Sequence, residues 1–69
     1  SLEALGGGFG LTQSEIAFCK RLLLGETIAE AAEKLGITQG TARTRLKAIF
    51  QKTGTSRQAE LMLLLVSMS

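Results

Sequence analysis

Hydrophobic residues recur at three- and four-residue spacing along most of the chain, which is the period of an amphipathic helix. This pattern runs through four segments, at about residues 12–24, 27–35, 38–53 and 56–67. No segment alternates apolar and polar residues for long enough to predict a β-strand. We therefore expect an all-α domain that resembles a four-helix bundle.

Glycines and hydroxyl residues separate the predicted helices. A glycine stands two positions before a threonine or serine in the pairs Gly25 and Thr27, Gly36 and Thr38, and Gly54 and Ser56. Glycine readily closes a last helical turn, and a hydroxyl side chain caps the first turn of the next helix. Thr12 with Glu15 and Thr27 with Glu30 also fit the capping box. The connection at residues 36–38 is too short for side-by-side antiparallel helices, so it predicts a helix-turn-helix corner.

The first ten residues differ from the rest in composition. Ser1–Gly10 contains four of the eight glycines, and the chain opens with Ser instead of Met. A glycine-rich stretch of this kind behaves as a flexible coil. We expect residues 1–10 to be a flexible linker or tail, residues 11–69 to form one small domain, and the chain to be a fragment of a longer protein.

The charges of the chain are unevenly distributed, although the formal total is only +2. Residues 1–37 contain three cations and five acids, whereas residues 38–69 contain five cations and one acid. The five cations of the second half are Arg43, Arg45, Lys47, Lys52 and Arg57. A basic face attracts a polyanion, although charge alone is equally consistent with a solvated helix surface.

The helix at residues 38–53 has two distinct sides. At about 100° per residue, one side gathers the apolar residues Ala42, Leu46, Ile49 and Phe50. The opposite side carries Gly40, Arg43, Thr44, Lys47 and Gln51. Polar groups on one face near a helix N-terminus suit base edges in the DNA major groove. We expect Arg43, Thr44 and Lys47 to face DNA bases.

These side chains have defined partners in such a complex. Arg43 can donate two hydrogen bonds to guanine, and Thr44 can meet a thymine methyl group or a phosphate. Residues expected to contact the DNA phosphate backbone are Thr38, Gln39, Gly40, Thr41, Arg45, Lys52 and Arg57. Thr38 has two interpretations, because its hydroxyl either caps the helix or donates to phosphate.

The last predicted helix, at residues 56–67, is apolar on almost all sides after Glu60. One small domain cannot cover every face of such a helix, and an exposed apolar patch usually marks an interface. We expect a homodimer interface formed by Leu61, Met62, Leu64, Leu65 and Met68. The alternatives are packing against another part of a longer protein and burial in the domain's own core.

At this point the chain resembles a known family over about residues 11–64, without a gap. The matching positions are Leu11-Thr12 with Glu15, Gly25, Thr27, Ala32, Leu35-Gly36-Ile37-Thr38, Thr41, Leu46, Ile49-Phe50, Lys52, Gly54 and Arg57. The family is the LuxR-type, or GerE-type, helix-turn-helix DNA-binding domain. The resemblance implies a bacterial transcription regulator whose third helix enters the major groove and whose fourth pairs with a second subunit.

Three positions depart from the family's usual pattern. Arg45 stands where His is most frequent, Ala31 where Ile is usual, and Arg21 where an apolar residue is common. Ala31 leaves a smaller core contact, which Ile28 offsets. Arg45 adds a permanent charge beside the expected recognition face, so DNA contacts there should differ from the family's usual ones.

Several function classes are disfavoured by composition. The chain has no histidine and one cysteine, Cys19, so we expect no enzyme, no metal and no cofactor. We interpret Cys19 as a buried thiol in a cytoplasmic, reducing environment. No run of about 18 apolar residues predicts a membrane span.

Two functions remain open from the sequence. The first is double-stranded DNA binding by the output domain of a regulator whose upstream part senses a signal. The alternative is a protein-docking module, in which the apolar last helix binds a partner helix.

Overall fold

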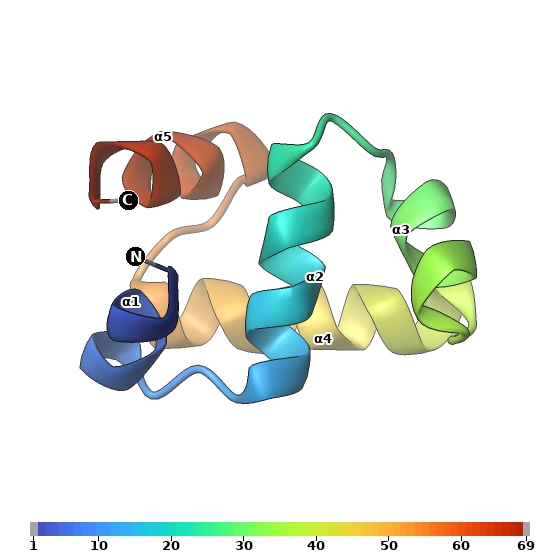
Figure 1. The fold of residues 1–69 in the computed structure, drawn as a ribbon, viewed down its shortest axis with the longest axis horizontal. Helices are drawn as coiled ribbons and strands as arrows, with labels where there is room; N and C mark the ends of the chain where they lie inside the picture. Colours follow the sequence, from blue (N-terminus) through green and yellow to red (C-terminus); the bar gives the residue numbers. More distant parts are fainter. Residues whose placement is uncertain (1, 69) are drawn as a thin grey trace.

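The computed structural model describes the backbone of residues 2–68 and the side chains of residues 6–67. It contains five helices over this range and no strand: α1 (Leu2–Phe9), α2 (Gln13–Leu23), α3 (Ile28–Leu35), α4 (Gln39–Thr53) and α5 (Gln58–Met68). The all-α prediction is confirmed. In Figure 1, α2 crosses α4, while α1 and α5 lie at one end of the molecule and α3 at the other.

Threonine caps fix the starts of three helices, as predicted. The Glu15 N–H donates to the Thr12 hydroxyl at 3.1 Å, and the Thr12 N–H donates to the Glu15 carboxylate at 2.8 Å. Thr27 and Glu30 form the same box at the start of α3. Each cap satisfies first-turn amides that the helix itself leaves without acceptors.

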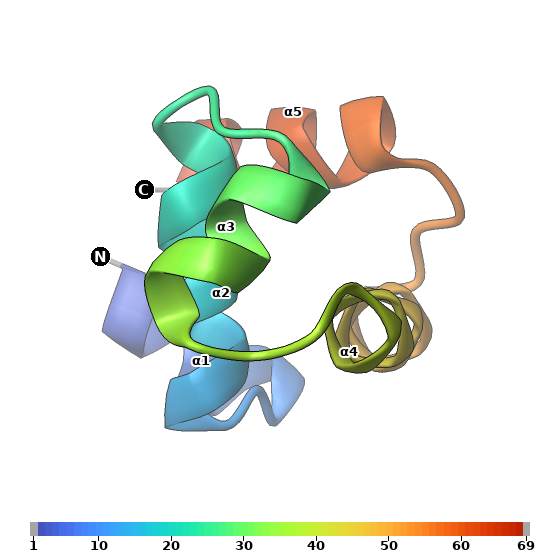
Figure 2. The same cartoon turned by 90° about the vertical axis from the view of Figure 1, so that its right-hand side faces the viewer.

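The corner between α3 and α4 is the predicted short turn. Gly36 closes α3 with φ of 69°, in the left-handed region that glycine adopts without strain. Thr38 then caps α4 through a bond from the Thr41 N–H at 3.1 Å. Figure 2 views α4 along its axis and shows α3 to its left, with its own axis in a different direction, so the two helices meet at a corner.

The start of α5 differs from the prediction. We expected Ser56 to cap this helix, but the helix begins at Gln58. The Glu60 carboxylate accepts the Ser56 N–H at 2.7 Å and lies 3.4 Å from its hydroxyl. Glu60, in the first turn of α5, therefore accepts a hydrogen bond from the backbone of Ser56. The serine hydroxyl does not cap α5.

The flexible linker expected at residues 1–10 is also corrected, because residues 2–9 form helix α1. α1 packs against α2 and α5. The Leu11 N–H donates to the Gly6 carbonyl at 2.8 Å, and Phe9 packs on the core. These tertiary contacts outweigh the poor helix propensity of the three glycines. Ser1 lies outside the described residues.

The core lies where α2, α3, α4 and α5 meet. Its buried apolar residues are Leu11, Phe18, Cys19, Leu22, Ala31, Ala32, Ala42, Leu46, Ile49, Leu61 and Leu65. Small alanines on α3 and α4 allow the two helices to approach closely. Phe50, which we placed in the core with Ile49, is only half-buried, whereas Ile49 is fully covered.

Candidate functional site

The outer face of α4 presents the cations expected from the sequence. Arg43, Thr44 and Lys47 are exposed, because Ala42, Leu46 and Ile49 point into the core and fix the rotation of the helix. Within residues 2–68, no carboxylate forms an ion pair with Arg43, Lys47 or Arg57. Their charges are therefore available to an external anion.

Thr44 lies between these cations with its hydroxyl proton directed back to the helix. The hydroxyl donates to the Gly40 carbonyl at 3.1 Å. This arrangement is common for threonine within helices. The side chain consequently offers its methyl group and hydroxyl lone pairs to the outside, while Arg43 and Lys47 offer donors.

The first turn of α4 resolves the two interpretations of Thr38. Its hydroxyl accepts from the Thr41 N–H and donates to the Thr41 hydroxyl at 3.0 Å, so Thr38 is an N-cap. The amides of Gln39 and Gly40 lie in the same turn, where helix geometry provides no intrahelical acceptor. A Cβ atom on Gly40 would meet only the Thr38 hydroxyl, at 3.9 Å. The fold therefore leaves open space around this exposed turn.

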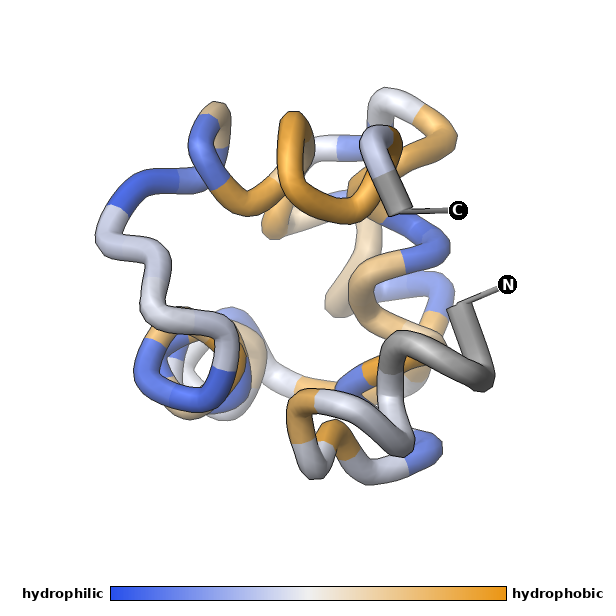
Figure 3. The backbone as a smooth tube through the Cα atoms, turned by 90° about the vertical axis from the view of Figure 1, so that its left-hand side faces the viewer, coloured by the Kyte–Doolittle hydropathy of each residue, from blue (hydrophilic) through white to orange (hydrophobic). Residues whose placement is uncertain are grey.

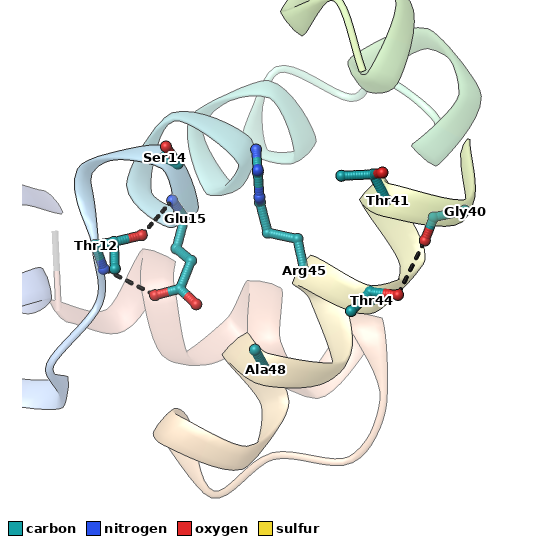
Figure 4. A pocket seen from close by; sticks show the side chains of 8 residues that line it. All are labelled: Thr12, Ser14, Glu15, Gly40, Thr41, Thr44, Arg45 and Ala48. Carbon is teal, nitrogen blue, oxygen red and sulfur yellow. Dashed lines mark hydrogen bonds between the residues drawn. The ribbon is translucent and has the colours of Figure 1, made fainter. Parts of the chain in front are cut away.

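A shallow groove runs between the start of α2 and α4. Figure 4 shows Arg45 extending from α4 across this groove, with Glu15 and Ser14 on the opposite side. Its lining residues are Thr12, Ser14, Glu15, Gly40, Thr41, Thr44, Arg45 and Ala48. Arg45 is half-buried, and no ion pair involves it among the described residues. The groove therefore joins the α4 face to the first turn of α2.

Lys52 has a different position from the other cations. Its ammonium donates to the Glu15 carboxylate at 2.7 Å, and the same oxygen accepts the Thr12 N–H. The Glu15 side chain is 7% exposed and that of Lys52 is 35% exposed. We expected Lys52 to contact phosphate, but its charge already neutralises a buried carboxylate and ties α4 to α2.

This ion pair decides the charge state of Glu15. Burial raises the pKa of the Glu15 carboxyl, but the Lys52 ammonium and the Thr12 amide outweigh burial, so the pKa falls below its ordinary value of 4.5. Glu15 is therefore an anion at neutral pH. The sequence indicated its capping role, but gave no sign of a partner 37 positions away.

Arg57 belongs to the segment between α4 and α5, and not to α4 itself. Its side chain is exposed, while its carbonyl accepts the Leu61 N–H at 3.0 Å and so begins α5. Arg57 is thus available to an anion from a separate element, beyond the C-terminal end of α4.

The predicted dimer residues of α5 fall into different environments. Leu61 and Leu65 are 0% exposed, because they point into the domain's own core. Their assignment to an intersubunit surface is therefore wrong for the folded domain. Met62 and Leu64 are half-buried. The Met68 side chain lies outside the described residues.

Sequence reasoning missed the apolar residues that α5 does expose. Leu63 is 73% exposed and Val66 is 62% exposed. With Ala59 and Met62 they follow i, i+3, i+4, i+7 spacing, which places them on one stripe. We call Ala59, Met62, Leu63 and Val66 the outer stripe of α5. Figure 3 shows that hydrophobic residues dominate this helix, which is why periodicity could not separate its two sides.

Other kinds of site find little support in the described part of the chain. Residues 2–68 contain no group of three potential metal ligands. Burial, reinforced by the negative charge of Glu15, raises the pKa of the Cys19 thiol to about 11. Cys19 is therefore an inert, protonated core residue at neutral pH.

The membrane criterion gives a negative result. No helix described in the structure combines the length and the hydrophobicity that a membrane crossing needs.

Comparison with known proteins gives no assignment. No family model, curated protein or solved structure matches this chain.

Proposed function

We propose that this domain binds double-stranded DNA sequence-specifically, with α4 in the major groove, as the output domain of a transcriptional regulator. One observation carries the proposal: Arg43 and Lys47 are exposed and unpaired among the described residues, on a helix whose opposite side is core. The major groove is wide enough to admit an α-helix, and polar side chains that extend from its exposed face can then reach the base edges.

Base recognition is assigned to three residues of α4. Arg43 donates two hydrogen bonds to guanine, and each such pair contributes about 1–3 kcal/mol of discrimination. Lys47 lies one helical turn further along and donates to an acceptor on a neighbouring base pair. Thr44 lies beside Arg43. Its methyl group contacts a thymine methyl group, or its hydroxyl oxygen accepts a hydrogen bond from a base amino group.

Phosphate contacts flank these bases. The amides of Gln39 and Gly40 point out of the first turn of α4, where the helix dipole favours an anion. Thr41 and Arg45 lie toward the α2 groove, and Arg57 lies beyond the other end of the helix. These contacts fix the position of the domain on the duplex but read no sequence.

The resemblance to LuxR-type domains supports the same function and adds two expectations. A cytoplasmic, full-length regulator would carry a sensory part upstream, and two copies would pair through α5. In the folded domain the available surface is the outer stripe of α5. Paired copies would read half-sites about 10 base pairs apart.

A salt titration with labelled duplex tests the proposal. DNA binding through several phosphates predicts that the logarithm of the association constant falls linearly with the logarithm of salt, with a slope of roughly −3 to −5. Selection from a random duplex pool would supply the preferred site. A shallow slope, or the absence of any preferred site after selection, would contradict the proposal.

Protein docking is the second candidate, because Leu63 and Val66 expose apolar surface on α5. It predicts a partner that binds the outer stripe and weak, sequence-independent affinity for DNA. Leu63→Glu separates the two functions. It should abolish docking, and it should leave the contact of one copy with a single half-site unchanged.

A further inference from the structure

Helix α1 is unusual because its sequence disfavours the conformation that it adopts. Three of its eight residues, Gly6, Gly7 and Gly8, are glycine. Each glycine lowers a residue's helical population by a factor of about 4–5 relative to alanine. Helices shorter than about 12 residues are also marginal in isolation. α1 therefore persists only while it is docked.

The three glycines have different relations to the surrounding structure. A Cβ atom on Gly6 would overlap Cδ1 of Ile16 and lie 3.1 Å from its Cγ1, so α1 approaches α2 closely at this point. Gly7 and Gly8 would meet nothing within 4 Å. Packing requires the first glycine but not the other two. Gly7 and Gly8 thus keep α1 weak where the fold has room for alanine.

The weak helix lies against α5. α1 packs on α5, and both views show the start of α1 beside the C-terminal end of α5. The helices α2, α3 and α4 contact one another directly, and the Glu15–Lys52 ion pair joins two of them. These contacts do not include α1, although α1 also packs on α2 at Ile16.

We propose that α1 is a hinged cover of α5, which opens as a unit while α2, α3 and α4 stay folded. Gly10, with φ of 74°, joins α1 to the capped start of α2 and forms the hinge. Opening breaks the Leu11–Gly6 bond and uncovers the side of α5 that faces α1. The proposal rests on the proposed function in one respect: pairing would use the exposed outer stripe of α5, and an open cover would add the side of α5 that faces α1 to the same contact.

Native-state hydrogen exchange on the full chain at low concentration tests the cover. The variant Gly7→Ala/Gly8→Ala should slow exchange of the Gly6–Phe9 and Leu11 amides by about 15- to 30-fold, after correction for intrinsic rates. In the parent protein these α1 amides should exchange through a much more frequent opening than the amides of α2, α3 and α4 do. Amides between Leu61 and Val66 should be loosened by the same opening, because α5 loses a neighbouring helix. Gly40→Ala is the matched control, because it adds a Cβ in open space on another helix.

Other exchange patterns would overturn the cover. Equal protection of all helices in the parent protein, or slowing of the α1 amides by Gly40→Ala, would mean that α1 opens only when the whole domain unfolds. Frequent opening confined to the α1 amides would mean that α5 keeps its packing when α1 opens, which would overturn the cover. Sedimentation equilibrium tests the link to pairing: the double variant should weaken self-association. Coupled exchange without self-association at any concentration would support the cover and count against the proposed pairing.

Discussion

Glu15 illustrates how one side chain can organise several parts of a small fold. Its carboxylate closes the cap of α2 and also accepts the Lys52 ammonium from the end of α4. A charge buried this deeply is costly unless it is paired and hydrogen-bonded. Lys52 thus serves stability first, while Arg43 and Lys47 remain free of intramolecular ion pairs among the described residues.

Two cations of α4 should therefore respond differently to substitution. Lys52→Met should lower the free energy of unfolding by about 1–2 kcal/mol, discounted for the partial exposure of the ammonium. Arg43→Ala should change it by less than about 0.5 kcal/mol, because the side chain has no partner to lose. Urea denaturation measures both. On the proposed function, Arg43→Ala should weaken a selected duplex more than a scrambled one. A destabilised Arg43→Ala would contradict the assignment.

The same ion pair predicts acid sensitivity. Because the folded pKa of Glu15 lies below its ordinary value of 4.5, its contribution to stability is present above that pH and is lost as the pH falls through the folded pKa. Thermal unfolding measured from pH 6 to pH 3 should show the loss. Glu15→Gln should flatten the pH dependence. Glu30, whose pKa is also lowered, keeps a residual slope in both proteins. Identical slopes would show that the pair does not control acid stability.

Cys19 provides a chemical test of the core. Burial and the nearby carboxylate raise its pKa to about 11, so the folded protein should present almost no thiolate at pH 8. Alkylation by iodoacetamide should be slow in buffer and fast in denaturant. Free cysteine under the same conditions is the control. Rapid labelling of the native protein would contradict the burial of this side chain.

At the scale of helices, two of the three phenylalanines, Phe18 and Phe50, contribute differently to stability. Phe18 is 0% exposed and belongs to the core, whereas Phe50 is half-buried at its edge. Phe18→Ala should cost about 3–5 kcal/mol, which is most of the stability of a small domain. Phe50→Ala should cost about 1–2 kcal/mol and leave a folded protein. Urea titration followed by circular dichroism measures the free energy of unfolding of both variants. A larger loss for Phe50→Ala than for Phe18→Ala would contradict the packing of α4.

The success of sequence reasoning followed the range of the interactions involved. The caps Thr12, Thr27 and Thr38 were predicted because a cap and its amide are only three residues apart. The outward face of α4 was predicted because its apolar period is clear. The α1 helix was missed because tertiary docking overrode the propensity of its glycines.

Two parts of the candidate site required coordinates. Leu61 and Leu63 have the same chemistry in a helix that is apolar on almost every side, so periodicity could not assign one to the core and the other to the surface. Lys52 could not be separated from the cations expected to face DNA, because its partner Glu15 is distant in sequence. In both cases the packing of whole helices decides the environment.

At the scale of the whole molecule, the domain has a basic surface on α4 and an apolar stripe on α5. α4 carries the unpaired cations, and α5 exposes Leu63 and Val66. On the proposed function, binding to DNA and pairing of copies would therefore use separate surfaces. Neither contact would involve the residues of the other.

Substitutions on α5 should separate pairing from folding. Leu63→Glu should change the free energy of unfolding by less than about 0.5 kcal/mol, since this side chain is solvated. On the proposed pairing, it should also abolish self-association. Leu65→Glu should prevent folding, because it places a charge among apolar core residues. Sedimentation equilibrium and circular dichroism distinguish these results. A Leu63→Glu protein that still pairs would exclude the outer stripe as the contact.

The attachment of α4 at both ends has a consequence for how binding preference evolves. The helix extends about 22 Å in a molecule whose longest dimension is 27 Å. The turn to α3 holds its start, and Lys52 holds its end against α2. Both attachments fix the direction of α4 relative to α2 and α3. On the proposed function, a new target preference would then come from exchanging the outward side chains of α4 alone. The outward residues of another recognition helix could therefore be grafted onto α4 without changing the fold.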